Sequence, residues 1–447
     1  MLAAVVHRRL QSGHRQLLPR PNREWVVRFH RALRRMRWRR AGCALASVAV
    51  LGACGRDVAA VQSEPLSDQD ILAISTPPDG STTRLDRFDP DTLVARADGV
   101  DLGEYHDAWA FSPDRRTLAV GTFVRTGVRL IDVKTLRVVR DIPMPIAVEG
   151  VAWLTPNRLA VLLQRGGVLV VSARTGRIER RRSLSYRPSC QVQRQASTRH
   201  GAFFVVATAG SGAVRLIRVR DGAPVRVLNL RGLRAPSGRH TCGTAALAVA
   251  PDQQRALLIA SGTIADVDLD TLAVRYRDAA SLRGVLGQRG DCRRCVARWR
   301  AVWPTSGTAA VARTEVRESA GGRVSERARG SALIDTASWR ARPLDPNAAE
   351  VMATSEGMLL TFGRSRPGLR ATALDASPRW EILSGTRVRG VAIAGARAYV
   401  LADAPGIVRV LDLRTGALVA SRSVALGRLD VLTGRSESGD ALSSSDG

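Results

Sequence analysis

Short apolar runs separated by turn-forming residues fill most of the chain between residues 70 and 433. The pattern is clearest in residues 109–140, WAFSPDRRTLAVGTFVRTGVRLIDVKTLRVVR. Its runs at 109–112, 117–122, 128–133 and 137–141 are rich in Val, Ile and Thr, and Pro113-Asp114 begins a turn after the first run. No run has the length or the 3.6-residue period of a helix, so the stretch predicts four short antiparallel strands.

The same unit recurs along the chain at a nearly constant spacing. An apolar residue followed by Asp marks the end of the third strand at Phe88-Asp89, Ile131-Asp132, Val267-Asp268, Ile334-Asp335, Leu374-Asp375 and Leu411-Asp412, with acid-free copies at Val171-Ser172 and Ile217-Arg218. Successive marks lie 43, 40, 46, 50, 67, 40 and 37 residues apart. The proline turn after the first strand keeps the same frame at Pro113, Pro156, Pro251 and Pro304. Four strands repeated every ~40–45 residues predict an all-β fold, a β-propeller of four-stranded antiparallel sheets.

Two stretches also resemble known repeat families. AFSPDRRTLAVGT, residues 110–122, is similar to the first two strands of a WD-repeat blade, and VRLIDVKTLRVVRDI, residues 128–142, resembles the YVTN-type repeat of bacterial surface propellers. SARTG at 172–176 and LDLRTG at 411–416 are similar to quinoprotein-type repeats. No copy ends its third strand in a Trp-Asp pair, and the docking Trp of quinoprotein repeats is mostly missing. The resemblance therefore implies a bacterial repeat propeller with no cofactor.

The two ends of the repeat region fit a closed ring. Residues 71–102 supply three strands with no first strand before them, and residues 428–433 form a lone apolar strand with no unit behind it. We expect the last strand to complete the first blade, because this removes the open sheet edge. Eight third-strand marks then predict eight blades, with seven as the alternative if one divergent copy is not a blade. Residues 434–447, rich in Ser, Gly and Asp, are predicted to be a disordered tail.

The formal net charge of +28 does not indicate a nucleic-acid-binding protein. Residues 1–40 hold 12 arginines against one Glu, so much of the excess lies in a leader. The remaining arginines are scattered over strands and turns, and aromatic residues make up only 4% of the chain. A nucleic-acid surface is expected to cluster its cations and interleave them with aromatic side chains, so we predict no nucleic-acid partner.

The apolar run at residues 41–53, after Arg37, Arg39 and Arg40, indicates an export signal. Its 13 residues are too few to cross a hydrocarbon core of ~30 Å. LGAC at 51–54 resembles the bacterial lipoprotein signal, which implies acylation of Cys54 and a translation start at Met36. We therefore predict a leader and signal peptide over 1–53, a lipidated Cys54 with a tether over 54–69, and a propeller over 70–433. The protein would be lipid-anchored on the outer face of the cell membrane.

Four cysteines remain after Cys54, and each falls close to the predicted start of a first strand: Cys190, Cys242, Cys292 and Cys295. An even number of cysteines in an exported protein favours disulfides, and we favour Cys190 with Cys242 and Cys292 with Cys295. Two alternatives remain open. His240 with Cys242, Cys292 and Cys295 has the donor types of a zinc site. The CRRC stretch at 292–295 could also be a redox pair, although its flanking residues predict a strand and not the helix start that would lower the thiol pKa.

The longest interval between marks contains an insertion at 313–330, RTEVRESAGGRVSERARG, which joins the second and third strands of one blade. Long loops on a rigid scaffold commonly carry binding. We expect Arg317, Arg323, Arg327 and Arg329 to meet an anionic partner, unless the insertion is only a solvated hairpin. His106, which resembles the loop histidine of a WD-repeat, and His240 lie on the same predicted face, although hydrogen bonding within the blade would explain His106 as well.

Together these features predict a non-catalytic binding or protein-interaction scaffold. Its partner would be another protein or a component of the cell envelope. No nucleophile-elbow serine, phosphate-binding glycine loop or acid–base pair is recognisable in the sequence. The alternative is an enzyme of the lactonase or quinoprotein dehydrogenase type, because propellers also carry those activities. A role in membrane assembly is a third reading and rests on fold analogy alone.

Overall fold

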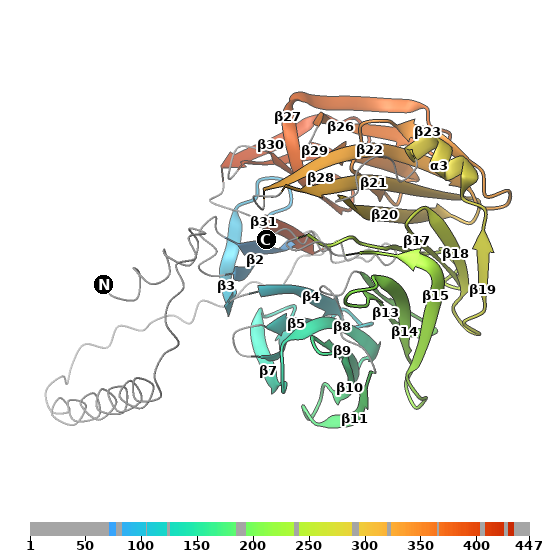
Figure 1. Cartoon of the computed structure of the whole chain (residues 1–447). Helices are drawn as coiled ribbons and strands as arrows, with labels where there is room; N and C mark the ends of the chain where they lie inside the picture. The colour runs from blue at the N-terminus through green and yellow to red at the C-terminus, as the bar shows by residue number, and fades with distance from the viewer. Residues whose placement is uncertain are drawn as a thin grey trace, which may run out of the picture. The chain divides into compact units, whose positions relative to one another are not determined.

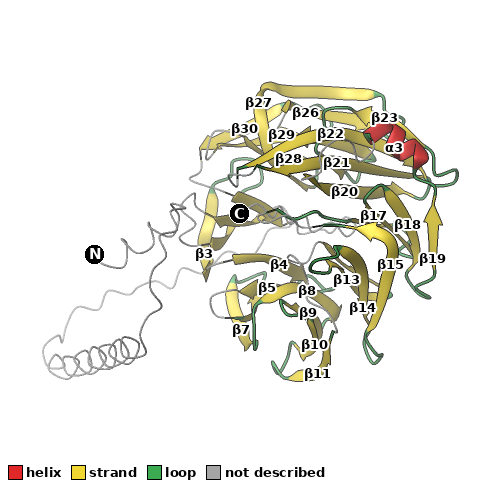
Figure 2. Cartoon of the chain, viewed as in Figure 1, coloured by secondary structure: helices red, strands yellow, loops and turns green. Residues whose placement is uncertain are grey.

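The computed structural model describes residues 71–76, 83–103, 105–122, 126–184, 194–236, 241–287, 295–319, 323–363, 366–402, 407–423 and 428–432. These residues all belong to one compact unit, Ser63–Gly447. They form strands almost throughout, with a single short helix, α3 (Ala280–Leu286), in the described segments (Figures 1 and 2). The predicted leader, Cys54, the tether and the tail lie outside the described residues.

The described strands build six four-stranded antiparallel sheets and one seven-stranded sheet. The first three sheets, in hydrogen-bonding order, are β31 (Arg428–Leu432), β1 (Ile71–Thr76), β2 (Thr83–Phe88), β3 (Ala95–Gly103); β4 (Tyr105–Phe111), β5 (Thr117–Thr122), β6 (Gly127–Asp132), β7 (Arg137–Pro143); and β8 (Val148–Thr155), β9 (Arg158–Leu163), β10 (Gly167–Ser172), β11 (Ile178–Ser183). The next three are β12 (Arg194–Thr198), β13 (Gly201–Ala207), β14 (Ala213–Val219), β15 (Arg226–Arg234); β16 (Ala246–Val249), β17 (Arg255–Ala260), β18 (Thr263–Asp268), β19 (Val274–Arg277); and β20 (Cys295–Thr305), β21 (Thr308–Glu318), β22 (Val324–Asp335), β23 (Ala341–Asp345). The seven-stranded sheet consists of β24 (Glu350–Ala353), β25 (Met358–Gly363), β26 (Arg366–Ala373), β27 (Pro378–Ala394), β28 (Arg397–Ala402), β29 (Ile407–Asp412) and β30 (Leu418–Ser423).

The seven-stranded sheet arises because one long strand serves two neighbours. The first part of β27, up to Arg387, pairs with β26, and the part from Val388 onward pairs with β28. The sheet therefore contains two successive groups of four strands that share β27. The sequence did not predict this continuous strand, and the number of blades stays a prediction.

The middle strands of the β8–β11 sheet are buried on both faces. In β9 and β10, five of the six residues are buried, whereas β11 at the outer edge has no buried residue. A strand that lies between neighbouring sheets needs apolar side chains on both faces, which explains continuous runs such as RLAVLL and GVLVVS. The sequence pattern of short apolar runs thus reports on strand position within a sheet.

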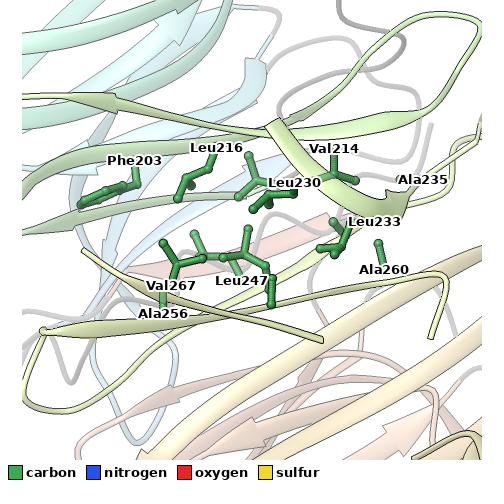
Figure 3. Packing of buried hydrophobic residues seen from close by; sticks show 14 of the residues in the cluster. Phe203, Val214, Leu216, Leu230, Leu233, Ala235, Leu247, Ala256, Ala260 and Val267 are labelled. Atoms are coloured by element: carbon green, nitrogen blue, oxygen red, sulfur yellow. The ribbon is translucent and has the colours of Figure 1, made fainter. Parts of the chain in front are cut away.

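Apolar clusters join the sheets in chain order. Between β12–β15 and β16–β19, Phe203 and Leu216 pack toward Leu247 and Val267 (Figure 3). A further cluster joins the two ends of the repeat region, because Ile71 and Ala73 of β1 pack with Tyr399 and Val410. The first and last sheets are therefore packed against each other as well.

The apolar-Asp marks end the third strand of their sheets, as the sequence predicts. In the turn after β6, the Asp132 carboxylate accepts hydrogen bonds from the Thr135 backbone N–H at 2.7 Å and its hydroxyl at 2.8 Å. The same pair of bonds recurs at Asp89, Asp268, Asp335 and Asp412. The following residue takes a positive φ, 52° at Leu136 and 73° at Gly416. This conformation costs a side-chain-bearing residue about 1–2 kcal/mol, which burying a leucine side chain (about 1.5–3 kcal/mol) offsets at Leu136.

Long polar side chains connect each of several sheets to the turn of the next. The acceptor is always a backbone carbonyl in or beside the turn between third and fourth strands. The pairs are Arg87 Nη2 with Lys134 O, Arg218 Nη1 with Leu269 O, Arg342 Nη2 with Leu374 O, Trp380 Nε1 with Leu413 O, and Tyr399 Oη with Pro90 O. The last pair joins the final sheet to the first. Buried arginines thus belong to the fold itself.

The sequence-based reading of the fold is confirmed in its main points. The chain is an all-β propeller with repeated four-stranded antiparallel sheets. The strand over 428–432 pairs with β1 in antiparallel register, from Leu72 opposite Leu432 to Thr76 opposite Arg428, which completes the first sheet as expected. The reading missed α3, whose buried Leu282 and Leu286 are spaced one helical turn apart in a segment of only seven residues.

Candidate functional site

The candidate site lies at the sheet ends where second strands turn into third strands and fourth strands lead to the next sheet. We call this the loop face. Its largest element is the hairpin of β21 and β22, which stay paired as far as Glu318 opposite Val324 (Figure 1). The insertion predicted at 313–330 therefore forms the outer part of a continuous ribbon. Apart from a β-bulge that leaves Arg329 without a cross-strand partner, the two strands stay in register, so the insertion extends the sheet.

A short segment before β16 adds to the inner edge of β20. Thr244 and Arg298 form an isolated parallel bridge, in which the Thr244 N–H donates to Ala297 O at 3.0 Å. In return, the Trp299 N–H donates to Thr244 O at 3.2 Å. The backbone on the inner side of β20 is thereby satisfied by residues from the preceding connection. The connection that carries Cys242 is held at this edge.

The hairpin is tied to the same connection by charged and polar side chains. Arg298 donates from Nη1 to Glu326 Oε1 at 2.8 Å and from Nε to the Cys242 carbonyl at 3.4 Å. The Thr241 hydroxyl donates to Glu318 Oε2 at 3.4 Å. Glu318 and Glu326 come from opposite strands of the hairpin, so one strand contacts the 241–244 connection directly and the other is linked to it through Arg298. These contacts position the ribbon over the start of β16.

The base of the hairpin contains a nearly buried ion-pair cluster. Glu315 accepts from Arg313 Nη2 at 2.6 Å and from Arg329 Nη2 at 2.5 Å, and the side chains of Glu315 and Arg313 are 7% and 5% exposed. Arg313 Nη1 also donates to the carbonyls of Leu286 and Gly287 at the end of α3. Its guanidinium lies 5.5 Å from the centre of the Trp299 ring. Removing one partner from such a cluster leaves an uncompensated buried charge, so the cluster fixes the ribbon at its root.

The outer part of the hairpin carries the exposed cations. Arg317, Arg323 and Arg327 are exposed, and within the described part of the chain none of their guanidinium groups lies within ion-pair distance of a carboxylate. Val324, between them, is 42% exposed. Arg329, the fourth arginine predicted to bind, instead belongs to the ion-pair cluster at the base. Three of the four predicted arginines are thus available to a partner.

The predicted cysteines and histidines are only partly described. Cys242 lies in the 241–244 connection, and Cys295 is the first residue of β20, opposite Arg317 in the sheet register. Cys242 and Cys295 are each disulfide-bonded. Cys190, Cys292 and His240 lie outside the described residues, so the pairing stays a prediction. His106 lies within β4.

Inner strands supply polar side chains that the sequence reading did not single out. Gln195 accepts from the Val151 N–H at 3.1 Å and donates to Trp109 O at 3.0 Å. Arg194 donates from Nη2 to Trp299 O at 3.4 Å. The two adjacent residues of β12 therefore reach β8, β4 and β20. Nothing in the local sequence marks them, because their partners are backbone groups 44 to 105 residues away.

The described residues contain no group of three or more His, Cys, Asp or Glu side chains arranged to hold a metal ion. None of the helices among them is sufficiently long and apolar to span a membrane. The loop face as described offers exposed guanidinium groups and paired carboxylates. Its chemistry suits the binding of an anionic surface.

No family model and no curated protein matches the chain. Among solved structures, dihydro-heme d1 dehydrogenase NirN in complex with DHE is similar over 81% of this chain and 75% of that chain, at 15% identity and a TM-score of 0.55. BamB from Moraxella catarrhalis is similar over 71% of this chain and 88% of that chain, at 15% identity and a TM-score of 0.44. The Swd1 β-propeller domain of Myceliophteria thermophila covers 70% and 85%, at 12% identity and 0.39. At 15% identity the likeness to NirN shows the propeller fold alone.

Proposed function

We propose that this protein is a membrane-anchored, extracytoplasmic propeller that acts as a non-catalytic binding scaffold. Its loop face would bind an anionic partner, either an acidic segment of another protein or an anionic component of the cell envelope. The observation that carries the proposal is the contrast within one hairpin. Arg317, Arg323 and Arg327 are exposed at its outer part, while Arg313, Glu315 and Arg329 fix its base.

A fixed base favours binding, because side chains and loops that become ordered only on association lose conformational entropy and so weaken the affinity. The ribbon is paired over its full length, and Arg298 and Thr241 hold both of its strands. Its guanidinium groups are therefore presented on a backbone that is already in place. Arginine forks bind carboxylates and phosphates in bidentate fashion, which fits an anionic partner better than an apolar one.

The localisation of the protein is also part of the proposal. Acylation of Cys54 would place the scaffold on the outer face of the membrane, with residues 55–69 as a tether to β1 at Ile71. Intact mass of the protein from its native membrane fraction tests this. We expect a mass that begins at an acylated Cys54, and an unlipidated mass that begins at Met1 or Met36 would contradict it.

Two further structural points belong to the proposal. The pairing of β27 with β26 and then β28 supports eight blades, because it divides the seven-stranded sheet into two groups of four. We also propose disulfides between Cys190 and Cys242 and between Cys292 and Cys295. Peptide mapping without reduction should recover these two linked pairs, and recovery of a Cys242–Cys295 peptide would contradict the pairing.

The binding role is tested with R317Q/R323Q/R327Q, which removes three exposed charges and leaves the ion-pair cluster intact. After cross-linking in native membranes, we expect the wild-type protein to retain a defined acidic component that the variant loses. The matched control is R137Q/R275Q/R389Q, which removes the same charge from exposed positions on β7, β19 and β27. Equal retention by all three proteins would contradict binding through the hairpin, and turnover of a lactone or an alcohol by the purified protein would favour the enzyme alternative.

A further inference from the structure

The arginines of this propeller are unevenly distributed between its sheets. Residues 144–234, which contain the sheets β8–β11 and β12–β15, hold 16 arginines against three acids. Residues 71–103, which supply β1 to β3, hold three arginines against six aspartates. One side of the ring is therefore strongly basic. The net charge of the whole chain does not reveal which sheets carry this excess.

The few acids of the basic side are already engaged or are enclosed by arginines. Glu179 and Asp221 both pair with Arg158, at 2.9 Å each. The exposed arginines of the two outer strands have no such partner. Arg181 and Arg182 on β11, with Arg226 and Arg231 on β15, are exposed and, among the described residues, no carboxylate lies within ion-pair distance of them. We call these four residues the basic rim.

Exposed aliphatic side chains accompany the basic rim. Ile178 on β11 is 46% exposed and Val227 on β15 is 38% exposed. The two strands are the outermost strands of adjacent sheets, and Arg180 of β11 donates to Ala223 O and Arg220 O in the turn before β15. The cationic and aliphatic side chains therefore lie on two neighbouring outer strands that the Arg180 contacts join.

Protection of open strand edges explains only part of this arrangement. Charged residues on edge strands prevent pairing between molecules, and arginine on an outer strand serves that purpose. On β19, however, Arg277 donates to Asp266, which is only 4% exposed and also pairs with Arg255. An edge-strand arginine can therefore be paired while it protects the edge. In the basic rim, four exposed arginines on two adjacent sheets are not paired with any carboxylate of the described residues.

We propose that the basic rim lies against the anionic lipid headgroups of a membrane surface. Guanidinium forks bind phosphate oxygens in bidentate fashion, and aliphatic side chains of the size of Ile178 and Val227 insert at the boundary between headgroups and acyl chains. Basic residues near an anionic leaflet contribute attraction that falls off within a Debye length, so the rim must lie close to the surface. This inference rests on the proposed function in one respect, because an acylated Cys54 would hold the rim near that surface.

The test uses the full-length, oxidised Cys54→Ser protein, which cannot be acylated, with vesicles of phosphatidylcholine alone or with one quarter phosphatidylglycerol. R181Q/R182Q/R226Q should bind the anionic vesicles about 100-fold more weakly, since each arginine contributes about fivefold. R137Q/R275Q/R389Q removes the same charge from exposed positions on β7, β19 and β27 and should change the affinity less than about threefold. Equal losses in both variants, or no loss in either, would overturn the proposal.

Hydrogen exchange gives a second measurement that the basic leader does not affect. We expect anionic vesicles to protect backbone amides of β11 and β15 more than those of β19 and β30. Protection elsewhere with none on β11 and β15 would also overturn the proposal. The protein in these experiments is not acylated, so the two tests are independent. Absence of acylation at Cys54 would not alter the vesicle result, and absence of vesicle binding would not alter the result on acylation.

Discussion

The two ends of the β21–β22 ribbon use the same residue type for opposite purposes. At the base, Arg313 and Arg329 share the Glu315 carboxylate, and Arg313 also satisfies two carbonyl groups at the end of α3. At the outer part, Arg317, Arg323 and Arg327 are exposed. The residue type alone therefore does not distinguish an arginine that stabilises the fold from one that is available to bind a partner. Burial and the position of the nearest acceptor do.

The contrast extends to the whole propeller. Arg87 and Arg218 are 2% and 5% exposed and donate to backbone carbonyls of the next sheet. A guanidinium group has five donors in a planar fork and stays charged when buried, so it can satisfy several carbonyls where an ammonium group fits less well. The near absence of lysine, with Lys134 as its single occurrence, is compatible with this structural use.

Replacing Glu315 with glutamine should have the largest effect. The change leaves Arg313 and Arg329 without their shared carboxylate in a nearly buried site, and we expect a loss of about 3 kcal/mol in the free energy of unfolding. Urea denaturation followed by tryptophan fluorescence measures it, since Trp299 lies beside Arg313. The control is E356Q, at an exposed residue, for which we expect less than about 0.5 kcal/mol. A loss as small as that of the control would show that the base of the hairpin is not held by this cluster.

Replacing Arg218 with lysine should have an intermediate effect. Arg218 Nη1 reaches both Leu269 O and Asp270 O, and a lysine amine on a differently shaped side chain would leave part of this bonding unmade. We expect a loss of about 1–2 kcal/mol in the free energy of unfolding. The same replacement at exposed Arg317 should change it by less than about 0.5 kcal/mol. Equal values for R218K and R317K would remove the distinction between the two classes of arginine.

Acid should weaken the turns opposite the loop face. The backbone N–H of Thr92, helped by the Thr92 hydroxyl and Arg96, lowers the pKa of Asp89 to about 2 from its usual 3.8. Hydrogen bonds in the equivalent turns also lower the pKa values of Asp268, Asp335 and Asp412. A carboxyl group with a lowered pKa in the folded state stabilises the protein above the unfolded pKa and loses this effect as the pH falls through the folded pKa. Urea midpoints should therefore fall between about pH 4 and pH 2, and D89N should show a smaller fall than the wild-type protein. An identical pH profile for D89N would contradict this assignment.

The smallest effect on stability is expected for R317Q/R323Q/R327Q. The three side chains are exposed, so their replacement should change the free energy of unfolding by less than about 0.5 kcal/mol in total. Thermal denaturation of the variant and the wild-type protein measures the difference. A loss comparable with that of E315Q would assign these arginines to the fold and leave the hairpin without a binding role.

The sequence predicted the strands well because their signals are local. Runs such as 117–122 and the Asp turns at 132 and 268 depend on neighbouring residues only, and the structure has β5, β6 and β18 where they were expected. The long β27 and the short α3 were missed. Both depend on contacts with other sheets: β27 pairs with two partners, and α3 buries Leu282 and Leu286 against strands distant in the chain.

The candidate site could be predicted only in outline. The unusual interval between repeat marks located the hairpin, and its arginines were recognisable as a cluster. The division between Arg329 at the base and Arg317 at the outer part was not, because it depends on Glu315 and on a β-bulge between Arg313 and Thr314. The contacts of Arg298, Thr241 and Gln195 link residues between 28 and 86 positions apart, so no local pattern reveals them.

Site-specific photo-crosslinking in native membranes tests the central claim most directly. A photoreactive residue would replace Ser325, which is exposed and lies opposite Arg317 in the hairpin, with Ala337 in an exposed turn at the opposite sheet ends as the control position. The account predicts one defined adduct from position 325, lost when Arg317, Arg323 and Arg327 are replaced by glutamine, and none from position 337. The same adducts from both positions, or an adduct from 325 that persists in the glutamine variant, would contradict a binding role for the exposed hairpin arginines.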